Sequence, residues 1–209
     1  MKRDKQTKEN LLKAAKEEFL DKGYMKASLR NICKKVDVTT GALYFFFQDK
    51  EDIFGALVEK PLREIYAIMK MHYEEEATLS PEDLLALGRM SGPMHGSRDY
   101  ETALDVVEYM YRYQEEFLLL LTKAQGSRYE NCMDAFIELS EIHYRRMADM
   151  MDQMTGKKGM DEDTLHCVVH LQMETFTQPI THGHEKERAK KQIASMVKFL
   201  MSGWFGLWK

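Results

Sequence analysis

The sequence predicts an all-α protein, and three observations agree on this fold class. Only four prolines and twelve glycines interrupt the 209 residues. Val, Ile and Thr are sparse beside Leu, Met, Ala, Glu and Lys, which favour helices at surface and core positions alike. No stretch alternates apolar and polar residues for the length of a strand. We therefore expect helices throughout the chain.

The first predicted helix lies near the N-terminus. Thr7 is a candidate N-cap, and Leu11, Ala15 and Phe19 recur on one stripe at helical spacing. Gly23 follows at the position just past a helix end, which favours glycine. The pattern indicates one amphipathic helix that ends at Gly23.

Two short helices are predicted next. Ser28 is expected to cap a helix over residues 29–36, and Thr39 or Thr40 is expected to cap another. Asp37 lies in the tight turn between them, where aspartate is among the few residues that tolerate a left-handed backbone.

Longer helices are predicted from residue 49 onward. Residues 49–52 have the form of a capping box, and Ser80 followed by Pro81 is a cap with proline at the first helical position. Residues 88–98 have the loosest composition of the chain and are expected to form a loop. The other helical patterns cover residues 100–113, 115–124, 129–154, 161–178 and 185–203.

Charge is divided unequally along the chain. Residues 1–50 hold 12 Lys and Arg against 7 Asp and Glu, a net charge of +5, while the remainder holds 18 against 27, a net charge of −9. A basic segment on an acidic body suggests that the basic segment meets a polyanion. Apolar runs such as residues 117–121 are far short of the roughly 20 residues that cross a bilayer, so no membrane partner is expected.

The cysteines and the N-terminus indicate the compartment. Cys33, Cys132 and Cys167 are far apart and odd in number, so neither a zinc finger nor a disulfide framework can be drawn. The basic N-terminus has no apolar stretch behind it, which argues against a secretory signal. A reducing cytoplasm is therefore expected. Because the chain has no glycine-rich phosphate loop and no local Ser/His/Asp set, we expect neither a cofactor nor catalysis.

The second and third predicted helices fit a helix-turn-helix, because apolar residues lie at the offsets that form its core. These residues are Ile32, Cys33, Val38, Leu43 and Phe47. The exposed side of the third helix can then enter a DNA major groove with its N-terminus first. That side carries Thr39, Thr40, Ala42, Tyr44 and Phe45, and Gly41 lets the backbone come close.

Residues 7–54 carry a longer pattern. A first helix ends in F-x-x-x-G-Y/F, a capped helix follows, and then comes G-x-L/I-Y-x-x-F-x-x-K-E-x-L. The matching residues are Phe19, Gly23, Tyr24, Ser28, Ile32, Val38, Gly41, Leu43, Tyr44, Phe47, Lys50, Glu51 and Ile53. With them the segment resembles the N-terminal domain of TetR-family transcriptional regulators. Two departures are Val36-Asp37, which is Ala-Gly in many members, and Phe46, which is often histidine.

The resemblance implies a role for each matched residue. Tyr44 would hydrogen-bond a DNA phosphate, and Ser28 and Lys50 would contact the DNA backbone. Thr39, Thr40, Ala42 and Phe45 would face bases or sugars. The resemblance also implies a helix-turn-helix DNA-binding domain over residues 1–50 and a helical effector-binding and dimerisation domain over residues 51–209.

The function that the resemblance implies is a homodimeric, DNA-binding transcriptional repressor whose binding to an operator is controlled by a small-molecule effector. Two alternatives stay open. One is a regulator that a partner protein switches. The other is a helical small-molecule-binding enzyme, which the lack of a convergent set of catalytic side chains disfavours.

Aromatic residues and methionines of the body are candidates for the effector pocket, with core packing as the alternative. They are Met110, Tyr113, Phe117, Phe136, Ser140 and His143. The chain holds 16 methionines, whose side chains can re-pack around different shapes. We expect an apolar or amphipathic effector that is neutral or cationic.

Two apolar stripes near the C-terminus are candidates for a dimer interface, because such stripes need a partner surface. The first holds Leu165, Val169 and Phe176, and the second holds Ile193, Val197, Leu200 and Trp204.

A third pattern on the same helices is polar. His166, His170 and Glu174 recur every four residues, which is compatible with a metal site but more typical of ordinary polar residues beside an interface. No metal is expected.

Overall fold

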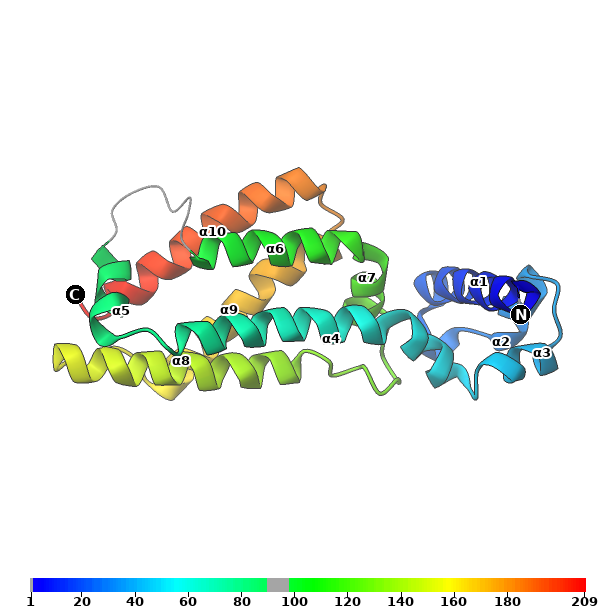
Figure 1. Ribbon diagram of the computed structural model, residues 1–209, viewed down its shortest axis with the longest axis horizontal. Helices are drawn as coiled ribbons and strands as arrows, with labels where there is room; N and C mark the ends of the chain where they lie inside the picture. Colours follow the sequence, from blue (N-terminus) through cyan, green and yellow to red (C-terminus); the bar gives the residue numbers. More distant parts are fainter. Residues whose placement is uncertain (1, 90–97) are drawn as a thin grey trace. The chain divides into compact units, whose positions relative to one another are not determined.

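The structure, a computed structural model, describes residues 2–89 and 98–209. Within these ranges it contains ten helices and no strand, which confirms the predicted fold class (Figure 1). The helices are α1 (Lys2–Lys26), α2 (Leu29–Lys35), α3 (Thr40–Phe46), α4 (Lys50–Glu76), α5 (Pro81–Arg89), α6 (Arg98–Arg112), α7 (Gln114–Thr122), α8 (Asp134–Thr155), α9 (Glu162–Thr181) and α10 (Lys186–Gly206). None of the helices in this described part combines the length and the hydropathy that a membrane span requires. The loop expected over residues 88–98 falls mostly outside the described ranges.

The chain packs into two units. Unit 1 comprises Met1–Glu64 together with Tyr113–Cys132, and unit 2 comprises Ile65–Arg112 together with Met133–Lys209. Unit 1 therefore holds α1 to α3, the first part of α4, and α7 with the segment that follows it. The expected division at residue 50 concerns function and stays a prediction.

Three predicted helix caps are confirmed. Thr39 Oγ1 accepts a hydrogen bond of 3.1 Å from the backbone N–H of Ala42 at the start of α3. Asp49 Oδ1 accepts one of 2.8 Å from the N–H of Asp52, and Asp52 Oδ2 in turn accepts one of 2.9 Å from the N–H of Gln48. These reciprocal bonds satisfy backbone donors that the first turn of α4 leaves unpaired. At α5, Ser80 Oγ accepts the N–H of Asp83 at 3.2 Å.

Two other expected caps differ from the structure. Thr7 lies inside α1, because the helix begins at Lys2 and the polar residues before Thr7 are good helix formers. Ser28 occupies the N-cap position of α2, but its hydroxyl makes no capping hydrogen bond.

The expected left-handed backbone of Asp37 is confirmed, and Gly23 also has a positive φ. Asp37 has a φ of 53° in the turn between α2 and α3. Gly23 has a φ of 72°, which interrupts the regular helix of α1. Glycine adopts this backbone without steric cost, and aspartate is one of the few other residues that tolerates it.

The core of unit 1 fixes the helix-turn-helix. Ile32, Cys33, Leu43 and Phe47 are all buried, as the sequence predicts, whereas Val38 is half-buried. Beneath them Phe19 packs edge-on against Phe54 of α4, with ring centroids 5.0 Å apart. The burial of Cys33 fits its interpretation as a packing residue.

The core of unit 2 includes two clusters of buried residues. One, made by α5, α8, α9 and α10, contains Leu165 and Trp204. The other, between α6 and α10, contains Ile193 and Val197. Both clusters lie within a single chain.

Candidate functional site

The first candidate site is the exposed side of α3. Tyr44 and Phe45 have exposed fractions of 56% and 77%, although both are large aromatic residues. Thr39, Thr40 and Gly41 at the N-terminal end of α3 are exposed as well, and Ala42 is half-buried. Leu43 and Phe47 hold the opposite side of the helix in the core. The residues predicted to face DNA thus share one accessible surface of unit 1.

A buried carboxylate attaches α2 to α1. Glu18 is 2% exposed, and its Oε1 accepts hydrogen bonds from Lys22 Nζ at 2.7 Å, Asn31 Nδ2 at 3.2 Å and the backbone N–H of Ser28 at 3.3 Å. Burial alone would raise the pKa of Glu18, but these bonds outweigh it and lower the pKa. Glu18 was not predicted as a functional residue. The sequence feature that could have identified it is its position beside Phe19, on the apolar stripe of α1.

Lys50, which was expected to contact the DNA backbone, makes contacts within the protein. Its Nζ donates to the backbone carbonyl oxygens of Tyr24 at 2.8 Å and Met25 at 3.2 Å, and it lies 4.5 Å from the centroid of the Tyr24 ring. An ammonium group has three N–H donors, so the carbonyls use two of them. Ser28, the other expected backbone contact, is half-buried, and its hydroxyl is not used for capping.

Glu51 joins the helix-turn-helix to the segment after α7. Its Oε2 accepts the Tyr24 hydroxyl at 2.6 Å, and its Oε1 accepts the backbone N–H of Arg128 at 2.8 Å. Burial and the charge of Glu51 together raise the pKa of Tyr24. The backbone N–H of Tyr24 also donates to the carbonyl of Lys123 at 2.8 Å. Residues from two distant parts of the sequence therefore build unit 1.

The residues expected to line an effector pocket are divided between the two units. Tyr113 and Phe117 belong to unit 1, whereas Met110, Phe136, Ser140 and His143 belong to unit 2 and are buried there. Tyr73 contacts two of these residues of unit 2. Its hydroxyl lies 3.0 Å from Ser140 Oγ, and its ring stacks on His143 with centroids 4.1 Å apart.

Five of the seven residues expected at a dimer interface are buried within the single chain. They are Leu165, Val169, Ile193, Val197 and Trp204, while Phe176 and Leu200 are half-buried. The periodicity identified the apolar stripes correctly, but these stripes face the chain's own core. The exposed sides of α9 and α10 instead carry Leu171, 41% exposed, and Phe199, 61% exposed.

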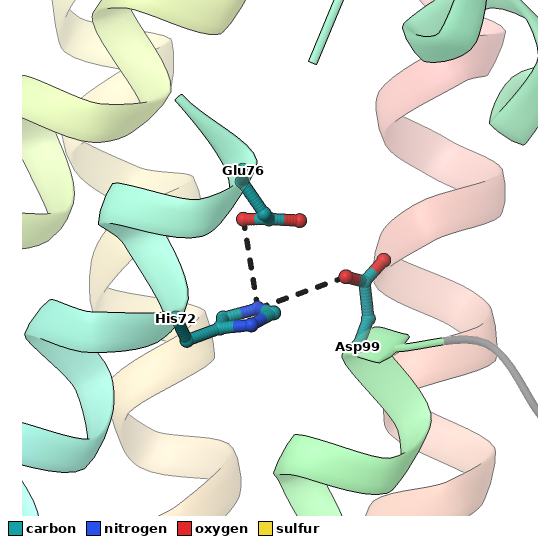
Figure 2. Close-up of side chains that lie close together, drawn as sticks. All are labelled: His72, Glu76 and Asp99. Carbon is teal, nitrogen blue, oxygen red and sulfur yellow. Dashed lines mark ion pairs between the residues drawn. The ribbon is translucent and has the colours of Figure 1, made fainter. Parts of the chain in front are cut away.

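A second candidate site, a half-buried polar cluster, lies in unit 2. His72 and Glu76 project from the last turns of α4, and Asp99 projects toward them from the first turn of α6 (Figure 2). His72 Nε2 is 3.5 Å from Glu76 Oε2 and 3.6 Å from Asp99 Oδ1. Burial and the negative charge of Glu76 raise the pKa of Asp99 to about 8. Burial also lowers the pKa of His72.

The histidine pattern considered in the sequence makes a different contact. His166 Nδ1 lies 2.6 Å from Glu141 Oε1, and the His166 and His170 rings are 4.3 Å apart between centroids. Within the described residues, His72, Glu76 and Asp99 are the group of side chains close enough together to share a metal ion. The sequence did not predict a site at these three residues.

The exposed, capped third helix, packed on α1 and α2, is the arrangement of the helix-turn-helix class of proteins. The comparison with known families agrees. Residues 11–57 match the family described as bacterial regulatory proteins, tetR family. The N-terminal segment of the chain is therefore similar to that of tetR-family regulators.

Two curated proteins illustrate the sequence similarity. The HTH-type transcriptional repressor BepR of Brucella suis is 42% identical over 53 residues, which are 25% of this chain and 25% of BepR. This alignment therefore spans a quarter of that relative's length. The uncharacterized HTH-type transcriptional regulator YvdT of Bacillus subtilis is 29% identical over 202 residues, which are 91% of this chain and 92% of YvdT.

Crystal structures extend the likeness in fold across the chain. NalD of Pseudomonas aeruginosa, the secondary repressor of the MexAB-OprM multidrug efflux pump, has a TM-score of 0.58 at 20% identity, over 97% of this chain and 98% of NalD. A TerR/AcrR-family transcriptional regulator of Aquifex aeolicus has a TM-score of 0.55 at 20% identity, over 92% of this chain and 98% of the regulator. At this identity the two structures show a shared fold alone.

Proposed function

We propose that the protein is a repressor that binds a DNA operator through α3, and the observation that carries the proposal is the exposed aromatic and hydroxyl surface of that helix. Tyr44 and Phe45 are exposed without serving the core, which is unusual for large aromatic side chains unless they meet a partner. The net charge of +5 over residues 1–50 favours a polyanion as that partner. Two of the similar proteins, BepR and NalD, are repressors.

The proposed DNA contacts divide into contacts with the backbone and contacts with the bases and sugars. Tyr44 donates its hydroxyl to a phosphate, and Ser28 and the remaining Lys50 donor contact the DNA backbone. The exposed end of α3, which comprises Thr39, Thr40, Gly41, Ala42 and Phe45, faces the bases and sugars of a major groove.

The experiment measures binding to DNA from the region upstream of the protein's own gene, by fluorescence anisotropy at several salt concentrations. Phosphate contacts release counterions, so affinity should fall steeply as salt rises. Tyr44→Phe should weaken binding to every bound sequence by about 1 kcal/mol, the net contribution of one hydrogen bond. Tyr66→Phe, which removes a tyrosine hydroxyl from unit 2 instead, should bind DNA as the wild type does. Salt-independent binding, or a Tyr44→Phe variant that binds normally, would contradict the proposal.

The proposal includes a homodimer that reads a two-fold operator. Since the apolar stripes of α9 and α10 are used in the chain's own core, the dimer contact is assigned to the other sides of these helices. Leu171 and Phe199 supply exposed apolar area there. Ser195, Ser202 and Gly203 on the exposed side of α10 are small enough to let a second helix approach closely.

The proposal also includes control by a small-molecule effector bound in unit 2. Met110, Phe136, Ser140 and His143 offer the mixture of apolar and polar groups that such sites have. An effector releases DNA only if it binds the DNA-incompetent state more tightly. A thermal-shift screen of neutral and cationic amphipathic compounds tests this, because a ligand of the native state raises its apparent stability. Compounds that stabilise the protein but leave operator affinity unchanged would refute effector control by this class.

A further inference from the structure

The half-buried polar cluster of unit 2 has the spacing of a metal site. One ligand atom from each of His72, Glu76 and Asp99 lies within 4.8 Å of the others. A tetrahedral metal ion with bonds of about 2.0–2.1 Å holds neighbouring ligand atoms about 3.3–3.4 Å apart. The distances from His72 Nε2 to the two carboxylate oxygens, 3.5 Å and 3.6 Å, are close to this edge length. These two distances differ from that edge length by only a few tenths of an ångström.

The orientation of His72 is fixed by a neighbour outside the cluster. Its Nδ1 lies 3.3 Å from Thr102 Oγ1, one turn along α6 from Asp99. Metal-ligating histidines almost always use the second ring nitrogen in such a hydrogen bond, which sets the ring's tautomer and direction. This contact leaves Nε2 as the nitrogen that faces Glu76 and Asp99 (Figure 2).

A second histidine contacts Glu76 from α8. The side chain of His143 is 5% exposed, and its Nε2 lies 2.9 Å from Glu76 Oε2. Carboxylates that bind metals are themselves held by such outer contacts. His143 is therefore a positioning residue for Glu76, outside the group of His72, Glu76 and Asp99.

A proton or a cation can balance the charges of the cluster. Two carboxyl groups, Glu76 and Asp99, both lie close to His72 Nε2. Like charges close together destabilise each other unless a proton or a cation lies between them. Arg98, next to Asp99 in the sequence, pairs with Glu75 instead.

We propose that His72, Glu76 and Asp99 bind a divalent first-row transition-metal ion, with a further position left for water or another ligand. One imidazole and two carboxylates form a mixed nitrogen and oxygen donor set, which suits Zn²⁺, Co²⁺, Ni²⁺ or Fe²⁺. The donor set contains no thiolate, which disfavours Cu⁺. The ion joins the last turns of α4 to the first turn of α6. The site does not depend on the proposed DNA contacts, which lie in unit 1.

The experiment uses the full-length, untagged protein after treatment with a chelator. Co²⁺ is added first, because four-coordinate Co²⁺ has intense visible d–d absorption that distinguishes a built site from loosely held ions. Zn²⁺ is then titrated by calorimetry. We expect one ion per chain, strong d–d bands, and competition between Zn²⁺ and Co²⁺ for the same site.

Variants assign the ion to the cluster. His72→Ala and Asp99→Asn should abolish the d–d bands. Thr102→Val, which removes only the orienting contact, should weaken Zn²⁺ binding by about 10–100-fold. Replacing the exposed pair His166 and His170 with alanine is the matched control and should leave binding unchanged.

Three results would overturn the proposal. They are an absence of bound Co²⁺, binding that persists in Asp99→Asn, and binding that is lost in the His166 and His170 double variant. Asp99→Asn keeps the shape of the side chain, and thermal unfolding of each metal-free variant confirms that it folds. Because operator binding is measured separately, failure of the metal site and failure of the proposed DNA-binding function are distinguishable.

Discussion

The Glu18→Gln variant tests whether the buried carboxylate of α1 holds the helix-turn-helix together. Glu18 accepts three hydrogen bonds, and the shortest comes from the ammonium group of Lys22. Glutamine keeps the volume but removes the negative charge that strengthens all three. A hydrogen bond to a charged group is worth about 1.5–3 kcal/mol, against about 1 kcal/mol for a neutral one. Because Lys22 is partly exposed and can turn to water, we expect a total loss of about 2–3 kcal/mol.

The assay is urea unfolding of the wild type and two variants. Glu17→Gln is the control, since it removes a carboxylate from the adjacent position, where the side chain is 56% exposed, and should change stability by less than about 0.5 kcal/mol. Glu18→Gln should also weaken operator binding, because Ser28 and α2 lose their attachment to α1. Equal stabilities of the two variants would refute the assigned role of Glu18.

The stabilisation by Glu18 has a defined pH dependence. The pKa of Glu18 is lower in the folded protein than in the unfolded chain, so its contribution is complete above the unfolded value of about 4.3 and is lost as the pH falls through the folded value. The stability difference between the wild type and Glu18→Gln should therefore be constant near neutral pH and shrink below about pH 4. A stability difference that grows on acidification would show that folding does not lower the pKa of Glu18.

Two further predictions concern α3 and the dimer. Thr39→Ala should destabilise the protein by about 1 kcal/mol through loss of the α3 cap, whereas Thr40→Ala, one position into the helix, should change urea unfolding little. Phe199→Lys places a charge on the exposed side of α10, so it should leave the fold of the single chain intact but shift sedimentation at micromolar concentration from dimer to monomer. A variant that sediments as the wild type does would remove Phe199 from the interface.

Local sequence signals predicted the helices and their caps well. Thr39, Asp49 and Asp37 could be assigned because a cap or a left-handed turn depends on residues within a few positions of each other. The core of the helix-turn-helix followed for the same reason, since its apolar residues lie within one short segment. The outcome for Ser28 shows the limit, because the position was right and the capping bond is absent.

Long-range contacts could not be predicted in this way. Glu51 contacts Arg128, 77 positions later, and no periodicity connects the two. His72 and Asp99 come together only because α4 and α6 meet at their ends. The apolar stripes of α9 and α10 were visible in the sequence, but an apolar stripe facing the chain's own core has the same pattern as one facing a partner.

The contact of Glu51 with the segment after α7 has a consequence for engineering. An N-terminal fragment that ends at residue 64 would lack Tyr113–Cys132, which contains the backbone partners of Tyr24 and Glu51. A chimeric regulator that joins only this fragment to another effector-binding domain would therefore lose these contacts. Unit 1 is made of two separate segments of the chain. A chimera that is to keep its operator specificity must therefore contain both Met1–Glu64 and Tyr113–Cys132.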